Sequence, residues 1–275
     1  MQFTGVSYKN KYENDIFMYK PPLALLEVHS ENYFNQPRAV KKLVALRGDY
    51  PLSLHGVNLS LGGTDSLNLV YLENLKQLIQ QVDPLFVSDH LAWTSLKSHY
   101  FHDLFPLPRT TETVNHIVER IQRVQTYLQR FILIENISSY VGFKIDYLAE
   151  WQMLNEIADR SGCGILLDLN NIYVSASHHH FKPQEYLQAI KTQHVKEIHL
   201  GGFTRREIEG QSILIDTHAD KVAQEVWVLY QEAIDQFGSL PTIIEWDDQL
   251  PSWEILYAEA KHAERFNITA ISGVI

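Results

Sequence analysis

The sequence predicts a single α/β domain, folded as a closed (β/α)8 barrel of the TIM type. Eight short apolar segments, most of them separated by an amphipathic segment, run through the 275 residues. This alternation is typical of parallel strands joined by helices, and the length is typical of one such barrel. No internal repeat or linker interrupts the chain, so we expect one domain over residues 1–275.

The expected strands are short apolar runs that end in polar residues. Residues 195–200 show the pattern clearly, with His199 near the C-terminal end of the run V-K-E-I-H-L. The eight strands are expected at residues 3–7, 23–29, 52–54, 85–88, 131–134, 164–167, 195–200 and 241–244. Because the C-terminal ends of all barrel strands open onto one face, the residues at these ends are expected to converge.

The expected helices carry apolar residues at intervals of three and four. Pro37 and Ser252 suit helix starts, and Gly238 suits a helix end. The helices are expected at residues 12–19, 37–47, 68–82, 113–128, 151–160, 183–191, 219–237 and 252–266. Residues 92–110 are expected to form a long loop, and histidines 178–180 a solvated loop, while residues 267–275 have no assignment.

Composition limits the possible partners. The chain has 23 Lys and Arg against 33 Asp and Glu, a formal charge of −10, which argues against nucleic acid as a partner. No N-terminal apolar core of a signal peptide is present, and no apolar run approaches the roughly 20 residues of a membrane helix. We therefore expect a cytoplasmic protein without a membrane partner. Cys163 is the only cysteine, which excludes a cysteine-rich metal site.

Side chains of the kinds that bind metal ions stand at most of the expected strand ends and in one loop. The set comprises Glu27, His29, His55, His90, Glu135, Asp168, Asn171, His199, Asp216, His218, Glu245 and Asp247. A single one of them is more often a satisfied polar group at a barrel rim than a ligand. Burial of the whole set without a shared cation would be costly. Because an ion with an open position needs three or four protein ligands, the set predicts two or three ions.

The ligand types narrow the choice of metal without settling it. Histidine and carboxylate without thiolate suit iron, zinc or manganese. Two histidines and one carboxylate with open positions are typical of non-haem iron enzymes that activate O2, but a two- or three-zinc hydrolase uses the same side chains. The residues alone therefore leave open an oxidative iron enzyme, a zinc or manganese hydrolase or isomerase, and a metal-binding protein without activity.

Eight motifs, in one order along nearly the whole chain, carry a family resemblance. They are LEVHSENY (26–33), LHGVNLSLGG (54–63), VSDHLAW (87–93), IENISSY (134–140), LLDLNNIYVSA (166–176), IHLGG (198–202), IDTH (215–218) and IEWD (244–247). With them the chain resembles the multinuclear non-haem iron-dependent oxidative enzymes of peptide natural-product biosynthesis, such as that of methanobactin. The resemblance implies a xylose-isomerase-like barrel that holds two or three irons, as Fe2+ and Fe3+, with O2 as co-substrate.

The resemblance also implies roles for single residues. By motif position, the metal ligands are His55, His90, Glu135, Asp168, Asn171, His199, Asp216, His218 and Glu245. Asp89 and Asp247 are the expected catalytic residues, and Glu27, His29 and Asn32 are expected to orient ligands or face the substrate. Phe203 departs from the family, which often has a histidine after the I-H-L-x-G motif, and this leaves the substrate and the reaction outcome open.

The activity that the resemblance implies is oxidation, with iron and O2, of a residue in a ribosomally made peptide, typically a cysteine. In this family a separate protein often recognises the leader segment of the peptide. All 275 residues are used by the eight strand-helix units, so we expect leader binding at the barrel rim or on another chain. The aromatic segment around Trp93, Tyr100, Phe101 and Phe105 is expected either to contact the peptide or to pack over the barrel mouth.

Overall fold

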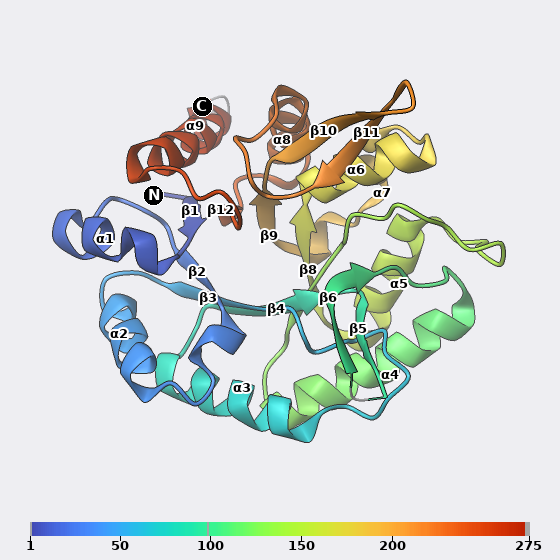
Figure 1. Ribbon diagram of the computed structural model, residues 1–275, viewed down its shortest axis with the longest axis horizontal. Coiled ribbons are helices and arrows are strands. Elements are labelled where there is room, and N and C mark those ends of the chain that lie inside the picture. Colours follow the sequence, from blue (N-terminus) through green and yellow to red (C-terminus); the bar gives the residue numbers. More distant parts are fainter. Residues whose placement is uncertain (1, 98, 273–275) are drawn as a thin grey trace. The chain divides into compact units, whose positions relative to one another are not determined.

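The computed structural model describes residues 2–97 and 99–272 (Figure 1). In this part of the chain, eight parallel strands close into a barrel in the order β1-β12-β9-β8-β7-β4-β3-β2. They are β1 (Thr4–Ser7), β2 (Leu26–His29), β3 (Leu52–Gly56), β4 (Phe86–His90), β7 (Leu133–Glu135), β8 (Gly164–Asp168), β9 (Val195–Leu200) and β12 (Thr242–Ile244). The expected (β/α)8 barrel is confirmed.

Most of the expected helices begin and end close to the expected residues, but α8 begins at Gln224 rather than at residue 219. They are α1 (Glu13–Tyr19), α2 (Pro37–Arg47), α3 (Leu69–Val82), α4 (Thr111–Leu128), α5 (Glu150–Ser161), α6 (Leu169–His179), α7 (Pro183–Ala189), α8 (Gln224–Phe237) and α9 (Trp253–Ser272), with 3-10 turns η1 (Asn10–Tyr12), η2 (Ser30–Tyr33) and η3 (Thr192–His194). Side-chain caps fix the starts of α3 and α4. The side chain of Asn68 accepts from the N–H groups of Val70 and Tyr71, and that of Thr110 from Thr113.

The chain forms two compact units. The first comprises Met1–Glu27, Ser138–Val141 and Leu167–Ile275, and the second comprises Val28–Ile137 and Gly142–Leu166. Strands β2 and β8 contribute residues to both units. One domain over the whole chain stays a prediction.

Parallel register places candidate ligands side by side within each unit. In the second unit, His55 of β3 lies opposite Ser88 of β4, and His90 of β4 lies opposite Glu135 of β7. In the first unit, His199 of β9 lies opposite Ile243 of β12, so the following Glu245 comes just past the end of β12. The strands therefore present these side chains at their C-terminal ends, as the barrel geometry predicts.

Two β-hairpins occupy segments for which no strand was expected. Strands β5 (Trp93–Leu96) and β6 (His99–Phe105) pair antiparallel, and so do β10 (Phe203–Ile208) and β11 (Gln211–Asp216). The loop expectation for residues 92–110 is wrong. Most residues of β6 and β10 are exposed on both faces, so neither strand has the alternating apolar pattern by which strands are recognised.

Helix α6 was also missing from the sequence-based expectation. It begins directly after Asp168, whose side chain accepts from the N–H of Asn171 and caps the helix. Its last turn holds His178 and His179, so the expected solvated loop is wrong for these two residues. Their Nε2 atoms lie 2.8 Å from the carbonyl oxygen of Leu214 and 3.0 Å from Ser139 Oγ, respectively.

Helix α9 continues beyond its expected end at residue 266, to Ser272. Residues 267–272 of the unassigned tail are therefore helical, and residues 273–275 lie outside the described residues. No described helix is long and apolar enough to cross a membrane.

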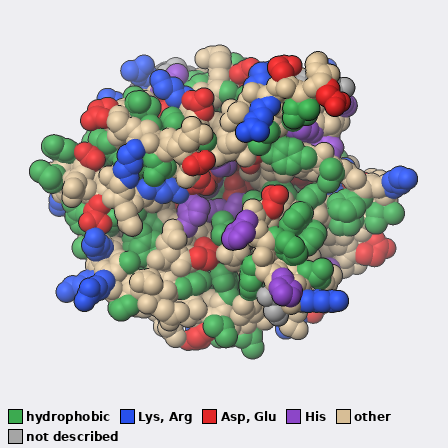
Figure 2. Space-filling model, in the orientation of Figure 1, with side chains coloured by type: hydrophobic (Ala, Val, Ile, Leu, Met, Phe, Trp, Pro, Cys, Tyr) green, Lys and Arg blue, Asp and Glu red, His purple; other side chains and the backbone are tan. Residues whose placement is uncertain are grey.

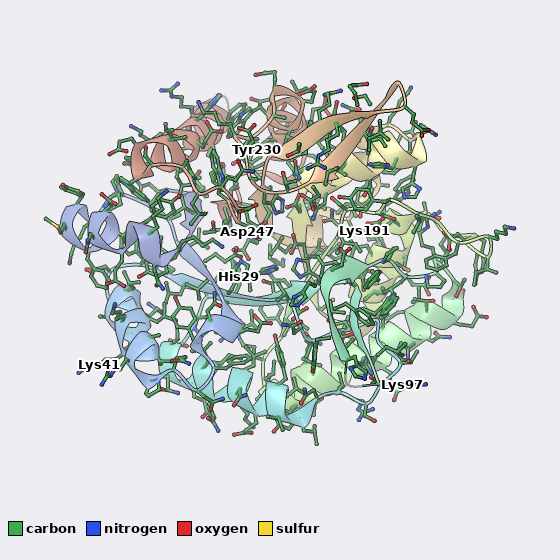
Figure 3. All side chains as sticks on the ribbon, viewed as in Figure 1. His29, Lys41, Lys97, Lys191, Tyr230 and Asp247 are labelled. Atoms are coloured by element: carbon green, nitrogen blue, oxygen red, sulfur yellow. The ribbon has the colours of Figure 1, made fainter. Side chains whose placement is uncertain are left out.

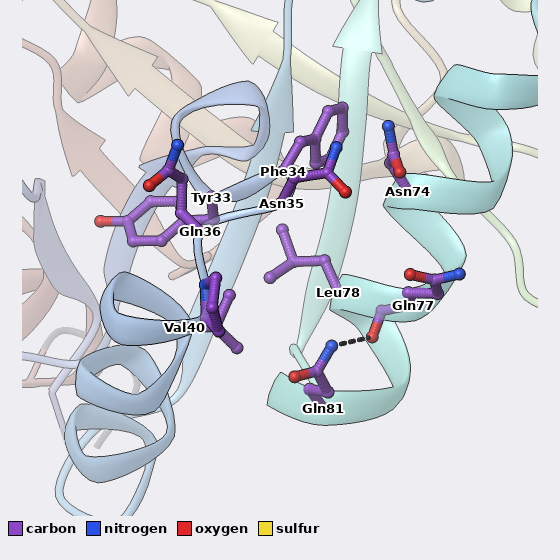
Figure 4. Close-up of a pocket in the computed structure, with 10 residues that line it drawn as sticks. Tyr33, Phe34, Asn35, Gln36, Val40, Asn74, Gln77, Leu78 and Gln81 are labelled. Carbon is purple, nitrogen blue, oxygen red and sulfur yellow. Dashed lines mark hydrogen bonds between the residues drawn. The ribbon is translucent and has the colours of Figure 1, made fainter.

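A pocket lies between the η2–α2 junction and α3 (Figure 4). It has about 410 Å³ of empty volume, including space open to solvent. Amide side chains line much of it: Asn35, Gln36, Asn74, Gln77 and Gln81. The ring of Phe34, also in the lining, meets the ring of Tyr71 edge-on at a centroid distance of 5.2 Å. The wall of the pocket therefore contacts Tyr71, whose side chain approaches the C-terminal end of β4.

Candidate metal centre

The first cluster of possible metal ligands comprises His55, His90 and Glu135, at the C-terminal ends of β3, β4 and β7. All three side chains are buried. His55 Nε2 lies 3.3 Å from His90 Nε2, and Glu135 Oε2 lies 3.3 Å from His55 Nε2 and 3.2 Å from His90 Nε2. Neighbouring ligands around an ion with bonds of about 2.1 Å are separated by roughly 3.0–3.4 Å, so the three atoms fit a shared metal ion.

The outer nitrogens of both imidazoles are held in place. His90 Nδ1 lies 3.2 Å from the carbonyl oxygen of Gly56, and His55 Nδ1 lies 2.8 Å from Ser88 Oγ. Because a carbonyl only accepts, His90 Nδ1 carries the hydrogen, and in the neutral ring the lone pair is at Nε2, facing Glu135. A lone pair that faces a carboxylate is repelled unless a proton or a cation lies between them. This arrangement suits a bound metal ion.

The second cluster lies in the first compact unit and comprises Asp168, His199, Asp216, His218 and Glu245. Glu245 Oε2 is 3.1 Å from His199 Nδ1 and 3.3 Å from His218 Nδ1. His218 Nε2 makes no hydrogen bond, although Asp216 Oδ1 and Asp168 Oδ2 lie 3.3 and 3.6 Å away. Imidazole nitrogen and carboxylate oxygen without thiolate suit a divalent transition metal.

The second cluster shifts the protonation of its own members. Burial raises the pKa of Asp168 to about 7, although His218 and His199 oppose the shift. Burial also raises the pKa of Asp216. At His218 burial lowers the pKa, but Asp216, Glu245 and Asp168 outweigh this and raise it to about 10. Without an ion, the surplus of carboxylates therefore holds protons that a bound cation would displace.

Two glycines of the I-H-L-G-G motif make room for the loop that carries His218. A Cβ on Gly201 would overlap the His218 ring, and a Cβ on Gly202 would overlap the carbonyl oxygen of Asp220. His218 has a left-handed backbone with φ of 43°, which is unusual for a residue other than glycine. The I-H-L-G-G motif thus supplies His199 and also leaves the space that the His218 ring occupies.

Glu27 and Glu197 lie close to His199, and Glu27 contacts the Nε2 atom of the ring, whereas Glu245 contacts Nδ1. Glu27 Oε2 lies 2.9 Å from His199 Nε2, which suits the expected role of orienting this ring. Sequence reasoning missed Glu197, which is buried and, with Glu27 and His199, forms a group that could hold a metal ion. The signal was available, because residues two apart on a strand face the same side.

The two asparagines after Asp168 differ in their contacts. Asn170 Nδ2 donates to Asp216 Oδ1 at 2.8 Å, whereas Asn171 Oδ1 accepts from Ser138 Oγ at 2.8 Å. Asn170 therefore contacts the second cluster, and sequence reasoning did not single it out. Asn171 as a metal ligand stays a prediction.

The expected catalytic residues have different environments. Asp89 is buried on β4 and accepts from the N–H of Leu59 at 3.1 Å, and burial together with the charge of Glu31 raises its pKa well above the usual value. Asp247 (Figure 3) is exposed after β12 and forms an ion pair with Lys9 at 2.6 Å. Their catalytic roles stay predictions.

His29 is the last residue of β2, and Asn32 lies in η2. The ring of His29 (Figure 3) meets the His55 ring edge-on at a centroid distance of 6.0 Å, which places it beside the first cluster. Asn32 is exposed. Phe203 begins β10 directly across from Asp216, and its ring stacks on Tyr173 at 5.5 Å. The departure from the family thus lies beside a candidate ligand.

The aromatic segment forms part of the β5–β6 hairpin. Trp93 stacks on Phe105 at 4.4 Å, and Phe101 meets both rings edge-on at 5.8 and 5.5 Å. Phe101 is 40% exposed and Tyr100 46% exposed, and hydrophobic side chains are visible on the face shown in Figure 2. The hairpin therefore presents both a packed aromatic cluster and exposed rings.

Solved structures support the fold. The chain matches D-psicose 3-epimerase from Clostridium cellulolyticum H10 with a TM-score of 0.62 and 13% identity, over 98% of this chain and 99% of that one. It matches a xylose isomerase domain protein from Planctomyces limnophilus with a TM-score of 0.59 and 10% identity, over 98% and 97%. At such low identity these likenesses show a xylose-isomerase-like barrel and nothing about activity.

Sequence comparison shows the family. A UPF0276 protein of Acaryochloris marina is 43% identical over 266 residues, which cover 97% of this chain and 95% of that protein. The model of the family described as RiPP precursor modification enzyme MbnB/TglH/ChrH matches residues 3–267. The resemblance identified from the motifs is confirmed. The chain belongs to the MbnB/TglH/ChrH family of enzymes that modify the precursors of ribosomally made, post-translationally modified peptides.

Proposed function

We propose that this protein is an iron- and O2-dependent oxidative enzyme that modifies a residue, typically a cysteine, of a ribosomally made precursor peptide. The observation that carries the proposal is the His55, His90 and Glu135 cluster, with three ligand atoms 3.2–3.3 Å apart, in a member of a peptide-modifying family. Bound iron would supply the capacity to reduce O2 with electrons taken from the peptide.

The residues of the chain divide the remaining tasks. His55, His90 and Glu135 would hold one ion, and the cluster of Asp168, His199, Asp216, His218 and Glu245 would hold at least one more. Glu27 would keep the His199 ring oriented through its contact at Nε2. Asp247 is the carboxylate proposed for catalysis, whereas Asp89, which accepts from the N–H of Leu59, would act by positioning its neighbours.

The substrate would reach the site as a peptide rather than as a small molecule. The exposed rings of the β5–β6 hairpin, including Tyr100 and Phe101, are the proposed contact for the peptide. A separate protein that binds the leader segment would complete recognition.

Reconstitution under controlled atmosphere tests the proposal. The metal-free protein would be loaded with Fe2+ or Zn2+ and mixed with a synthetic cysteine-containing precursor peptide encoded beside this gene, with and without its neighbouring partner protein. We expect O2 uptake and a change in peptide mass only with iron and peptide together. Conversion of the peptide with zinc in the absence of O2, seen as the gain of one water or as a new chromatographic peak of unchanged mass, would instead support a hydrolase or an isomerase. O2 uptake driven equally well by free cysteine would contradict a peptide substrate.

A further inference from the structure

Tyr71, a buried residue that the sequence analysis did not single out, lies close to the strand that carries His90. Tyr71 of α3 donates its hydroxyl hydrogen to Glu31 Oε1 at 2.7 Å, and the same hydroxyl lies 3.4 Å from Asp89 Oδ2. Asp89 immediately precedes His90 on β4, but successive strand residues point to opposite faces. Its side chain is therefore directed toward α3, while His90 faces Glu135.

The two carboxylates hold the segment that follows His55. The N–H groups of Val57 and Asn58 donate to Glu31 Oε1 at 2.8 and 3.1 Å, and the N–H of Leu59 donates to Asp89 Oδ2 at 3.1 Å. Three consecutive peptide N–H groups are thus bound by carboxylates. Because these buried or partly buried hydrogen bonds fall on consecutive peptide groups, the segment is firmly positioned.

Gly56 lies between this segment and the metal ligands. A Cβ at position 56 would come within 2.5 Å of Asp89 Oδ2 and 2.7 Å of the Tyr71 hydroxyl, so the carboxylate and the hydroxyl pack directly against the glycine backbone. The Gly56 carbonyl oxygen is the acceptor for His90 Nδ1. The same carbonyl that fixes the hydrogen of His90 on Nδ1 is therefore held in place by Glu31, Tyr71 and Asp89.

We propose that Glu31, Tyr71 and Asp89 are positioning residues for the first metal site. They hold the Gly56 carbonyl so that His90 keeps its hydrogen on Nδ1 and presents Nε2 to the ion. Groups that orient a ligating histidine in this way typically change metal affinity by 10–100-fold when they are removed. The inference rests on the proposed function in one respect, which is that the His55, His90 and Glu135 cluster binds a metal ion.

Tyr71→Phe is the decisive variant, because it removes the hydroxyl and keeps the ring that packs against Phe34. Tyr127→Phe is its matched control, since the Tyr127 hydroxyl also donates to a glutamate, Glu73 Oε2 at 2.8 Å, but on the exposed surface between α4 and α3. Both are made in a His218→Ala background, so that visible absorption of added Co2+ reports mainly the first cluster. We expect Tyr71→Phe to weaken Co2+ binding about 10–100-fold, and Tyr127→Phe to leave it unchanged.

A second measurement works without any metal. ¹⁵N-labelled histidine in the metal-free protein reports by NMR which ring nitrogen of His90 carries hydrogen. We expect Nδ1 of His90 to carry hydrogen in the parent, with or without a second hydrogen on Nε2, and to carry it in only part of the Tyr71→Phe molecules. If that variant does not fold, Glu31→Gln keeps the side-chain shape, removes the charge that holds Val57 and Asn58, and is read out in the same way.

The outcomes separate the two proposals. Unchanged Co2+ affinity together with an unchanged His90 form in the folded variant would overturn the positioning role. Failure of the wild-type protein to bind Co2+ or Fe2+ would instead remove the proposed function. In that case the NMR measurement still decides whether Tyr71 fixes the hydrogen of His90.

Discussion

The imidazole ring of His218 occupies the space that the Cβ atom of any residue other than glycine would need at position 201. We therefore expect Gly201→Ala to displace His218 and to cost the protein at least one bound ion. The strand that precedes it ends at Leu200, so the fold should remain. Metal content by elemental analysis and far-UV circular dichroism check both halves. Gly48→Ala, at the exposed end of α2, is the control and should retain all metal.

If each cluster binds its own metal ions, a substitution in either cluster should remove only the ions of that cluster. Supplied with iron, the wild-type protein should contain about two or more ions per chain, because the ligands exceed what one ion can use. His55→Ala and His218→Ala should each lose at least one ion while their circular dichroism stays close to that of the wild type. His116→Ala is the control, since His116 Nε2 lies 2.8 Å from the backbone carbonyl oxygen of Gly63, which is not a candidate ligand. Full metal and activity in His218→Ala would make this residue a structural rim group.

His218 predicts how the stability of the metal-free protein depends on pH. Its pKa is raised from 6.5 to about 10 in the folded state, so folding takes up a proton between these values. The stabilisation is complete below pH 6.5 and is lost as the pH rises through 10, at about 1.4 kcal/mol per pKa unit. Urea unfolding at pH 6.5, 8 and 9.5 should show falling stability, with a smaller slope in His218→Gln. Equal slopes would assign the effect to other groups.

The same protons predict the pH dependence of metal binding. An ion must displace the proton of His218 and that of Asp168, whose pKa burial raises to about 7. Apparent Co2+ affinity should therefore rise with pH from 6 to 9. Calorimetry in two buffers of different ionisation enthalpy would measure the protons released. Release of no proton at pH 7 would contradict the prediction.

Phe101 tests the proposed peptide contact. Because its ring is 40% exposed on the β5–β6 hairpin, Phe101→Ser should raise KM for the precursor peptide several-fold and leave metal content unchanged. Phe131→Ser is the matched control, since Phe131 is 44% exposed but precedes β7 at its N-terminal end. A loss in kcat with unchanged KM would show that the hairpin serves the chemistry rather than the peptide.

Elements with strong periodicity could be predicted from the sequence. Helix α2 begins and ends at the expected residues, because Pro37 fixes its start and its apolar residues recur at helical spacing. Strand β8 was found because its I-L-L run is continuously apolar, as buried parallel strands often are, and β9 because its apolar residues end in a polar strand end. The hairpins were missed because exposed strands lack that pattern, and α6 was missed because its buried face includes Asn170, Asn171 and Ser175.

The site was predictable to the extent that strand ends determine it. His55, His90 and Glu135 were expected together because parallel strands end on one face, and the structure brings them together. Asn170, and not Asn171, donates to Asp216. This choice depends on the first turn of α6, a helix that the sequence pattern did not predict. The contact of Tyr71 with Glu31 requires α3 to dock beside η2, which is a tertiary relationship without a local signal.

The β10–β11 hairpin has a consequence for how the protein exchanges metal. Its two strands form main-chain ladder bonds with each other, as a separate two-stranded sheet among the described residues, and it ends in Asp216, two residues before His218. The left-handed backbone of His218 costs about 1–3 kcal/mol, so this segment lies nearer to opening than the strands do. We therefore expect an ion held by Asp216 and His218 to be released by local opening of the hairpin, at a rate that does not follow the global unfolding rate. The other members of the second cluster, on or next to barrel strands, would stay in place during that opening.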